Sequence, residues 1–170
     1  GTGDFLKPLR KAVGQGLIVG LDFCLPMLAK AKDKSDASLG LADACRLPVQ
    51  GGRFEAVTVG WGIRNVPDID QAHREIARVL KPGGRFASLD MAQPRNAVMR
   101  RFSSLIFNTM VPRLGSLFGS KNAYTYLPKS TERFWSREEL AESMRRAGFI
   151  DVRHKDLFFG NICAHFGRKP

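Results

Sequence analysis

The chain has 170 residues, of which 44% are hydrophobic and 25% are charged, and its formal net charge is +11. This length and composition fit one soluble globular domain with a sizeable core. No apolar run is long enough to span a bilayer, and the first residues do not form a signal peptide. The cysteines Cys24, Cys45 and Cys163 are widely spaced, which argues against a disulfide framework or a zinc site and favours a reducing cytoplasm.

Apolar segments alternate with amphipathic segments along the first half of the chain. Such alternation implies a parallel, doubly wound sheet whose ligands bind at the carboxyl ends of the strands. Residues 81–84 (Lys-Pro-Gly-Gly) should close a helix, because glycine supplies the C-cap conformation and proline cannot continue it. We expect His73, on that helix, to be solvated. The pattern predicts strands at residues 17–22, 38–42, 54–60 and 85–90 and helices at 26–34 and 70–80.

The second half of the chain departs from this alternation. Ser136 and Glu139 have the spacing of a capping box, which marks the start of a helix. We interpret the whole chain, residues 1–170, as a single domain in which residues 95–135 form an insert over the substrate side. The pattern predicts a helix at residues 96–111, a loop at 112–127, a helix from Ser136 to about Ala147, and an antiparallel hairpin of strands at 151–159 and 161–166.

Basic residues cluster at residues 95–101, at residues 145–146 and at residues 168–169. A basic surface attracts nucleic acid or anionic lipid headgroups, and it can equally be a solvated face without a partner. Aromatic and basic residues are not interleaved in the way that stacks single-stranded bases, so we expect no nucleic-acid partner. The helix at residues 96–111 has an apolar side flanked by arginines, which fits core packing or, alternatively, contact with a membrane surface.

Three segments have the residue types of a nucleotide-binding site. Gly1-Thr2-Gly3 is typical of a glycine loop that lets the backbone approach a cofactor, although a frayed terminus has the same composition. Asp22 ends a strand about twenty residues further on, where acids accept hydrogen bonds from ribose hydroxyls. Asp43 and Ala44 follow the next strand, and an ordinary turn acid is the alternative there.

Residues 60–65 (Gly-Trp-Gly-Ile-Arg-Asn) form the most specific segment. Arg64 and Asn65 place a cationic fork beside an amide at a strand end, a pair suited to an oxygen that gains negative charge. A structural arginine paired with a carboxylate is the alternative. The sequence shows no nucleophile–base pair and no metal-ligand spacing, and we expect a structural role for His165.

Residues 60–68, together with residues 78–84 (Arg-Val-Leu-Lys-Pro-Gly-Gly), resemble class I S-adenosylmethionine-dependent methyltransferases. The residues of these segments are similar to those of the family that methylates a quinone ring carbon in menaquinone, ubiquinone or phylloquinone synthesis. The resemblance extends over nearly the whole chain and includes Tyr124-x-Tyr126. It implies a Rossmann-like, mostly parallel sheet with a C-terminal antiparallel hairpin, in which the strand that normally precedes Gly1 is missing.

This resemblance also implies a cofactor, S-adenosylmethionine, and a metal-free reaction at the carboxyl ends of the strands. Arg64 and Asn65 are the implied catalytic residues, and Tyr124 and Tyr126 are expected near the substrate. Met91 and Gln93 differ from the residues that the family typically has in this segment, which includes a lysine, so the role of that lysine is in doubt in this chain. The residues implied to bind the cofactor are Gly1, Thr2, Gly3, Asp22, Asp43, Ala44 and Gly60.

The implied reaction is methylation of a prenylated quinol ring, of the demethylmenaquinol to menaquinol type. We expect a cytoplasmic protein, in peripheral contact with the inner face of the membrane, that forms a homodimer. Two alternatives stay open at this point: a methyltransferase that acts on RNA or on another small molecule, and a truncated fragment without catalytic activity.

Overall fold

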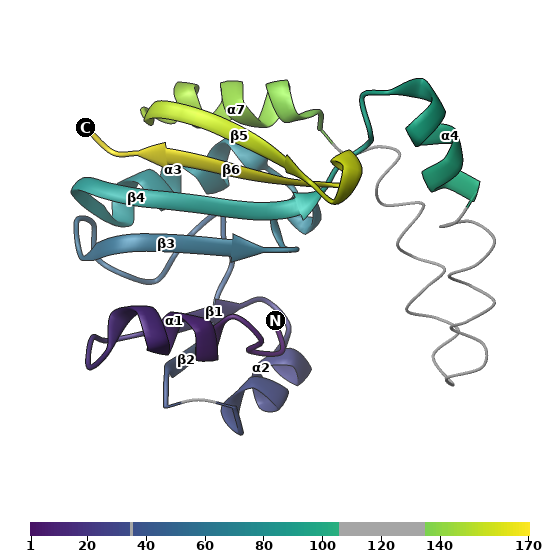
Figure 1. The fold of residues 1–170 in the computed structure, drawn as a ribbon. Coiled ribbons are helices and arrows are strands. Elements are labelled where there is room, and N and C mark those ends of the chain that lie inside the picture. The colour runs from purple at the N-terminus through teal and green to yellow at the C-terminus, as the bar shows by residue number, and fades with distance from the viewer. Residues whose placement is uncertain (35, 106–134) are drawn as a thin grey trace.

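The computed structural model describes residues 1–34, 36–105 and 135–170 of an α/β protein (Figure 1). The strands are β1 (Val19–Asp22), β2 (Ser38–Leu41), β3 (Phe54–Gly60), β4 (Leu80–Met91), β5 (Ile150–Leu157) and β6 (Ile162–Arg168). The α-helices are α1 (Leu6–Val13), α2 (Leu25–Lys32), α3 (Ile69–Val79), α4 (Ala97–Leu105) and α7 (Arg137–Arg146), and the 3-10 turns are η1 (Ile63–Asn65) and η3 (Phe158–Gly160).

The strands form two sheets. β1 and β2 pair in parallel, and a four-stranded sheet has the order β3-β4-β6-β5. Within that sheet β3 and β4 run parallel, and β6 runs antiparallel to both of its neighbours. The structure therefore confirms the predicted strands of the first half and the antiparallel hairpin at the C-terminal end.

A gap in hydrogen bonding separates the two sheets. In the part of the chain that the structure describes, no strand joins β1 to β3, and the unit of α1, β1, α2 and β2 lies beside the β3 edge (Figure 1). The interruption falls where the resemblance implied a strand ahead of the glycine loop. The free edge of β3 exposes backbone donors and acceptors that a neighbouring strand would otherwise pair.

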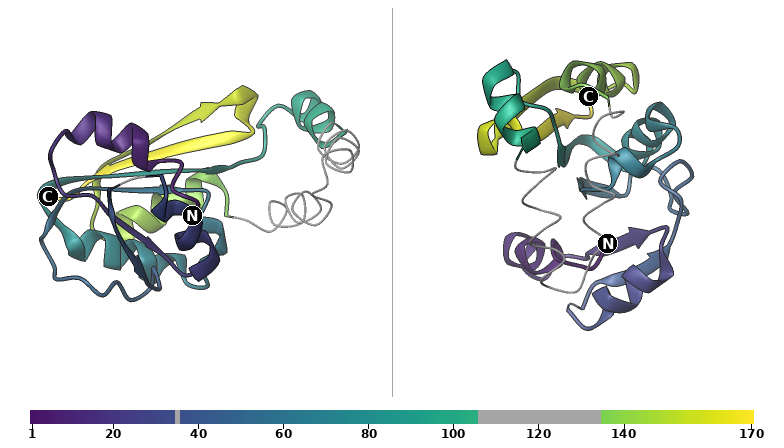
Figure 2. Two further views of the ribbon diagram at one scale, coloured as in Figure 1. Left: turned by 90° about the horizontal axis from the view of Figure 1, so that it is seen from below. Right: turned by 90° about the vertical axis from the view of Figure 1, so that its right-hand side faces the viewer.

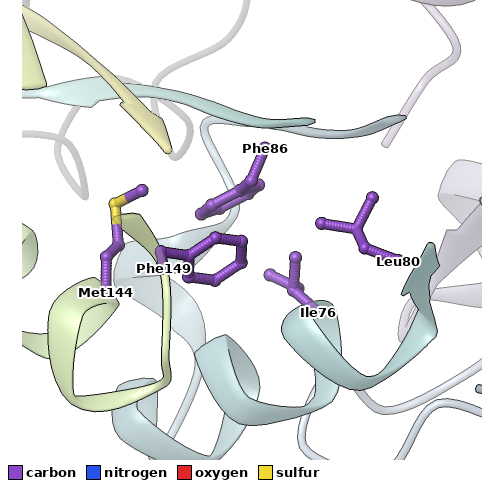
Figure 3. Close-up of a cluster of buried hydrophobic side chains, with 5 residues drawn as sticks. All are labelled: Ile76, Leu80, Phe86, Met144 and Phe149. Atoms are coloured by element: carbon purple, nitrogen blue, oxygen red, sulfur yellow. The ribbon is translucent and has the colours of Figure 1, made fainter. Parts of the chain in front are cut away.

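Helices cover both faces of the strand layer, as a doubly wound arrangement requires. α1 lies on one side, whereas α3 and α7 lie together on the other (Figure 2). Between the sheet and these two helices lies the largest buried cluster, which is fully apolar (Figure 3). Its buried members are Ile76, Leu80, Phe86, Met144 and Phe149. No helix among the described residues is both long and apolar enough to cross a membrane.

The start of α7 has the predicted capping box. The Glu139 N–H donates to Ser136 Oγ at 3.2 Å, and the Ser136 N–H donates to Glu139 Oε2 at 2.6 Å. These reciprocal bonds satisfy two donors that the first helical turn leaves without intrahelical partners. The helix therefore begins at a fixed residue, and its apolar side faces the sheet.

The end of α3 differs from the expectation. The helix stops at Leu80, which has φ −72° and ψ 143°, so the glycines of residues 81–84 are not its C-cap. Leu80 already pairs with Phe54 as the first residue of β4. Pro82 also prevents the helix from continuing, because its ring would clash with the Arg78 carbonyl and it disfavours the helical conformation in Lys81. Gly83, with φ 76°, instead forms a turn within β4, where its N–H donates to the Lys169 carbonyl at 3.0 Å.

His73 also contradicts the expectation, because it is buried and not solvated. Its Nδ1 lies 2.7 Å from Ser143 Oγ of α7, and that hydroxyl donates to Asp70 Oδ1 at 2.6 Å. Burial lowers the pKa of His73 to about 4. The imidazole is therefore neutral at pH 7 and acts as a polar link between α3 and α7.

The helices α1 and α4 differ in how far the sequence predicts them. α1 was not predicted, and its Leu6 packs against Ile18 and Ala31 in a small separate core. α4 confirms the predicted helix at residues 96–111 as far as Leu105. The remainder of that helix and the predicted loop at residues 112–127 lie outside the described residues.

The buried His73 makes a testable prediction for stability against pH. Its pKa in the folded protein, about 4, lies below the ordinary value of 6.5, so the unfolded chain takes up a proton first as the pH falls. The stabilisation that the neutral imidazole of His73 gives to the folded state is complete above pH 6.5 and is lost as the pH falls toward 4. Between pH 8 and pH 5, urea unfolding should show the wild type losing about 2 kcal/mol more than His73→Gln. Equal losses of unfolding free energy in the wild type and in His73→Gln would contradict this explanation.

Candidate functional site

The candidate site lies at the carboxyl ends of β3 and β4, where a tight turn follows Gly60. Trp61 has φ 59°, and its N–H donates to the Leu89 carbonyl of β4 at 2.8 Å. The chain then forms η1, whose side chains lie against the end of β4. Because β3 and β4 are parallel neighbours, the Arg-Asn pair of the turn and the acid that ends β4 meet at one edge.

Arg64 and Asp90 form a buried ion pair at this edge. Arg64 Nη1 lies 3.3 Å from Asp90 Oδ1, and only 8% and 4% of the two side chains are exposed. The Arg64 backbone N–H also donates to Asp90 Oδ2 at 3.3 Å, and the Met91 N–H donates to Oδ1 at 2.8 Å. Asp90 therefore fixes both the turn and the guanidinium that the turn carries.

The electrostatics of this pair are dominated by burial. Burial raises the pKa of the Asp90 carboxyl, while the Met91 N–H and the Arg64 guanidinium act in the opposite direction. A charge removed from water is costly unless it is paired and hydrogen-bonded. Asp90 has both an ion-pair partner and hydrogen-bond donors, whereas the Arg64 guanidinium has the ion pair but no hydrogen bond at Nε or Nη1.

Two donors on Arg64 remain unsatisfied. Its Nε and Nη1 are buried and make no hydrogen bond among the described residues, because Nη1 is within ion-pair distance of Asp90 but does not have hydrogen-bond geometry to it. Buried donors of this kind are rare in folded proteins because each one costs its full desolvation free energy. An oxygen of a bound molecule or of a water would satisfy them, and the pairing with Asp90 is the structural alternative that the sequence left open.

The neighbours of Arg64 are aromatic and amide groups. The guanidinium carbon lies 6.0 Å from the centre of the Trp61 ring, within the range of a cation–π contact. Asn65 Nδ2 donates to the Trp61 carbonyl at 3.4 Å, and its side chain is exposed. The structure therefore brings together the two predicted catalytic residues and adds Asp90, which the sequence analysis did not select. The missed signal was an acid at the end of the strand that follows the Arg-Asn turn.

The predicted cofactor residues lie at the carboxyl ends of β1 and β2. Asp22 Oδ1 accepts a hydrogen bond from the Cys24 N–H at 2.7 Å, and its Oδ2 contacts the amino group of Gly1. Gly3 has φ 79°, and a Cβ there would lie 2.9 Å from Ala31 Cβ, so only glycine fits. Of the predicted glycine segment, Gly1 lies beside the predicted ribose acid, whereas the Thr2 hydroxyl donates to Asp4 Oδ2 at 2.6 Å.

Asp43 lies two residues beyond the end of β2. Its Oδ1 accepts from the Cys45 N–H at 2.8 Å, which orients the exposed carboxylate, and Ala44 is half-buried beside it. Asp22 and Asp43 are therefore fixed acceptors at the ends of paired strands. Carboxylates in this position can accept hydrogen bonds from ribose hydroxyls and amino groups, so these two acceptors fit an adenosyl group.

Gly60 stands between the two halves of the site. A Cβ added to Gly60 would lie 2.3 Å from the Phe5 ring, so a side chain there would displace the segment that leads into α1. A pocket of about 210 Å³ begins just beyond Asp90 and includes Met91 and Gln93, the two positions that depart from the family's wording. Tyr124 and Tyr126 lie outside the described residues.

Among the described residues, the remaining cysteine and histidine contacts do not form a second reactive site. Cys163 Sγ lies 4.0 Å from His165 Nε2, but burial raises the pKa of the thiol to about 11, so it is protonated at neutral pH. His165 Nε2 contacts the Arg137 carbonyl at 3.0 Å, which fits its expected structural role. Residues 1–34, 36–105 and 135–170 contain no cluster of potential metal ligands.

The Arg64–Asp90 pair makes a prediction for stability. Asp90→Asn should lower the free energy of unfolding by about 3 kcal/mol, because a buried guanidinium loses its counter-charge. Arg64→Met combined with Asp90→Asn should cost at least about 1 kcal/mol less than the sum of the single changes, as measured by urea unfolding. The matched control is the exposed Glu55–Lys81 pair, where Glu55→Gln and Lys81→Met should be nearly additive. Additive effects at Arg64 and Asp90 would contradict the pairing.

Comparison with known proteins agrees with this geometry. The model of the ubiE/COQ5 methyltransferase family matches residues 1–169. The demethylmenaquinone methyltransferase of Desulfitobacterium hafniense (strain Y51) is 40% identical over 179 residues, which cover 100% of this chain and 71% of that protein. The enzyme of the same name from Staphylococcus aureus (strain JH9) is 41% identical over 175 residues, covering 99% of this chain and 73% of that protein.

Solved structures show the same fold at lower identity. A SAM-dependent methyltransferase from Thermotoga maritima has a TM-score of 0.72 at 21% identity and covers 100% of this chain and 78% of its own. A SAM-dependent methyltransferase from Aquifex aeolicus has a TM-score of 0.70 at 16% identity, with coverage of 99% and 77%. With the site and these similarities together, the chain belongs to the ubiE/COQ5 family of methyltransferases.

Proposed function

We propose that this protein transfers a methyl group from S-adenosylmethionine to a ring carbon of a prenylated quinol, of the demethylmenaquinol to menaquinol type. The ring carbon gives up its proton, and S-adenosylhomocysteine is the other product. The observation that carries the proposal is the buried guanidinium of Arg64, whose Nε and Nη1 lack hydrogen-bond partners among the described residues. The similarity to demethylmenaquinone methyltransferases supports a naphthoquinol ring as the acceptor.

The proposed role of Arg64 follows from its charge. A quinol hydroxyl that loses its proton places negative charge on its oxygen and on the ring carbon ortho to it. A fixed guanidinium in a water-poor site stabilises such charge more strongly than water does. Arginine does not give up its own proton near neutral pH, so Arg64 stabilises the anion and does not act as the base.

Asp90 and Asn65 support this role in different ways. Asp90 holds the guanidinium and the backbone of η1 in place, so the guanidinium does not have to move when the substrate ionises. The Asn65 amide stands beside it on the same turn as a further polar group for the quinol oxygen or a bound water.

The cofactor would be held by the other half of the site. Asp22 and Asp43 would accept hydrogen bonds from the ribose and the adenine, which the orientation of both carboxylates by backbone N–H groups supports. When bound, S-adenosylmethionine supplies an activated methyl group on a sulfonium. The protein's contribution is to hold the ring carbon in line with that group, and orientation of this kind accounts for much of the rate in two-substrate reactions.

The direct test is methyl transfer from labelled S-adenosylmethionine to a short-tailed demethylmenaquinol, with the methylated position assigned by mass spectrometry. We expect label on the ring carbon, and Arg64→Met should lower kcat by about 10²–10³-fold because the stabilising charge is lost. The affinity for S-adenosylmethionine, measured by calorimetry, should change little.

The matched control is Arg53→Met, which removes an exposed arginine just ahead of β3, at the end of the strand opposite to the site. This variant should keep the wild-type rate. Transfer of label to RNA in place of the quinol, or equal rates for the two arginine variants, would contradict the proposed function.

A further inference from the structure

The hairpin that joins β5 to β6 presents large apolar side chains to solvent. Phe158 and Phe159 of η3 are 67% and 76% exposed, and Leu157 before them is exposed as well. The two aromatic rings pack edge to face with centroids 6.1 Å apart. Three adjacent apolar side chains at one tip form a patch, unlike the scattered single exposures that are normal on protein surfaces.

The backbone of this tip is strained. Phe158 and Phe159 have φ 48° and 56°, in the left-handed region that bulky side chains rarely adopt. The conformation is held by Asn161, whose N–H and Nδ2 both donate to the Phe158 carbonyl at 3.1 Å. Packing in the core does not explain this strain, because both aromatic side chains point away from it, and backbone strain of this kind clusters at functional sites.

Basic residues lie beside the same tip. The chain leaves β4 next to the hairpin, where the Ala92 N–H donates to the Asn161 carbonyl at 2.8 Å, and then enters α4 (Figure 1). Arg100 and Arg101 are exposed on α4, as is Val98 with 79% of its surface accessible. Arg95, just before the helix, is paired with Glu138 of α7 and contacts His154 of β5. Residues 94–105 include three arginines and no acidic residue.

We propose that η3 and α4 form a docking surface for an anionic lipid bilayer. Aromatic side chains at an exposed tip enter the interface between headgroups and acyl chains, and arginines beside them pair with anionic headgroups. The absence of acidic residues on α4 and the net charge of +11 match a negatively charged surface. A surface for another protein is the competing interpretation, and the test below separates the two.

The docking surface lies at the same end of the molecule as Arg64. Met91, the last residue of β4, pairs with Ile162, the first residue of β6, so the tip and the carboxyl ends of β3 and β4 point the same way. A bilayer bound at the tip would therefore face the end of the sheet that holds the site. The docking itself does not depend on the proposed reaction and can be measured without any substrate.

The experiment is co-sedimentation of the protein with vesicles of phosphatidylglycerol and phosphatidylcholine in equal amounts. Phe158→Asn combined with Phe159→Asn should weaken binding at least tenfold, and asparagine tolerates the left-handed backbone. The matched control, Val13→Asn with Leu17→Asn, removes two exposed apolar side chains at the opposite end of the strands and should bind like the wild type. Equal binding by the two double variants would overturn the proposal.

A second pair of variants tests the charge. Arg100→Gln with Arg101→Gln should reduce binding and flatten its dependence on salt, whereas Lys30→Gln with Lys32→Gln, an equal loss of charge on α2, should have little effect. Failure of the wild-type protein to bind the anionic vesicles would overturn the proposal. So would sedimentation showing that the tip variants abolish self-association while vesicle binding stays unchanged, because the tip would then be an interface between copies of this chain.

Discussion

The buried contact between Arg64 and Asp90 is the constraint on which the site depends. Two opposite charges lie in the interior at the ends of neighbouring parallel strands, and Asp90 additionally accepts backbone N–H groups from Arg64 and Met91. Such a pair adds little net stability compared with apolar packing. Its value lies in position, because it holds a guanidinium with unsatisfied donors in one orientation beside Trp61.

The fold explains why the functional groups collect at one end. In parallel strands joined by helices, every carboxyl end lies at the same edge of the sheet. β1 and β2 therefore deliver Asp22 and Asp43 to that edge, while β3 and β4 deliver Arg64 and Asp90. The same topology places the β5–β6 tip near this edge, because the hairpin returns antiparallel to β4. The guanidinium and the exposed aromatic residues thus follow from the arrangement of the four-stranded sheet, and the predicted cofactor acceptors follow from the pairing of β1 with β2.

Local sequence patterns predicted most of the fold. The β-branched run of β3 and the capping box of α7 are local signals, and both elements appear with the predicted starting residues. Patterns failed where distant contacts decide. His73 looks like a surface residue of an amphipathic helix until Ser143, 70 positions later, is seen to cover it. That α3 ends before Pro82 could have been predicted, because proline acts locally on Lys81 and on the Arg78 carbonyl. Its exact end at Val79 depends on the pairing of Leu80 with Phe54 of β3.

The candidate site was predictable in part for the same reason. Asp22 ends a strand, and Arg64, Asn65 and Asp43 follow one, in residue patterns that the family resemblance reinforces. Asp90 as the partner of Arg64 was not predictable, since 26 residues separate them and only the parallel pairing of β3 with β4 brings them together. The burial that leaves Nε and Nη1 without partners likewise emerges only in three dimensions.

The central claim is that Arg64 stabilises negative charge on a quinol oxygen. It is tested most directly by the pKa of a bound single-hydroxyl analogue, 4-methoxy-1-naphthol, measured by ultraviolet absorbance in the presence of S-adenosylhomocysteine. Binding to the wild type should lower the pKa of the naphthol hydroxyl by about one to three pH units. Binding to Arg64→Met should leave it unchanged or raise it. An equal lowering in both proteins would contradict the account.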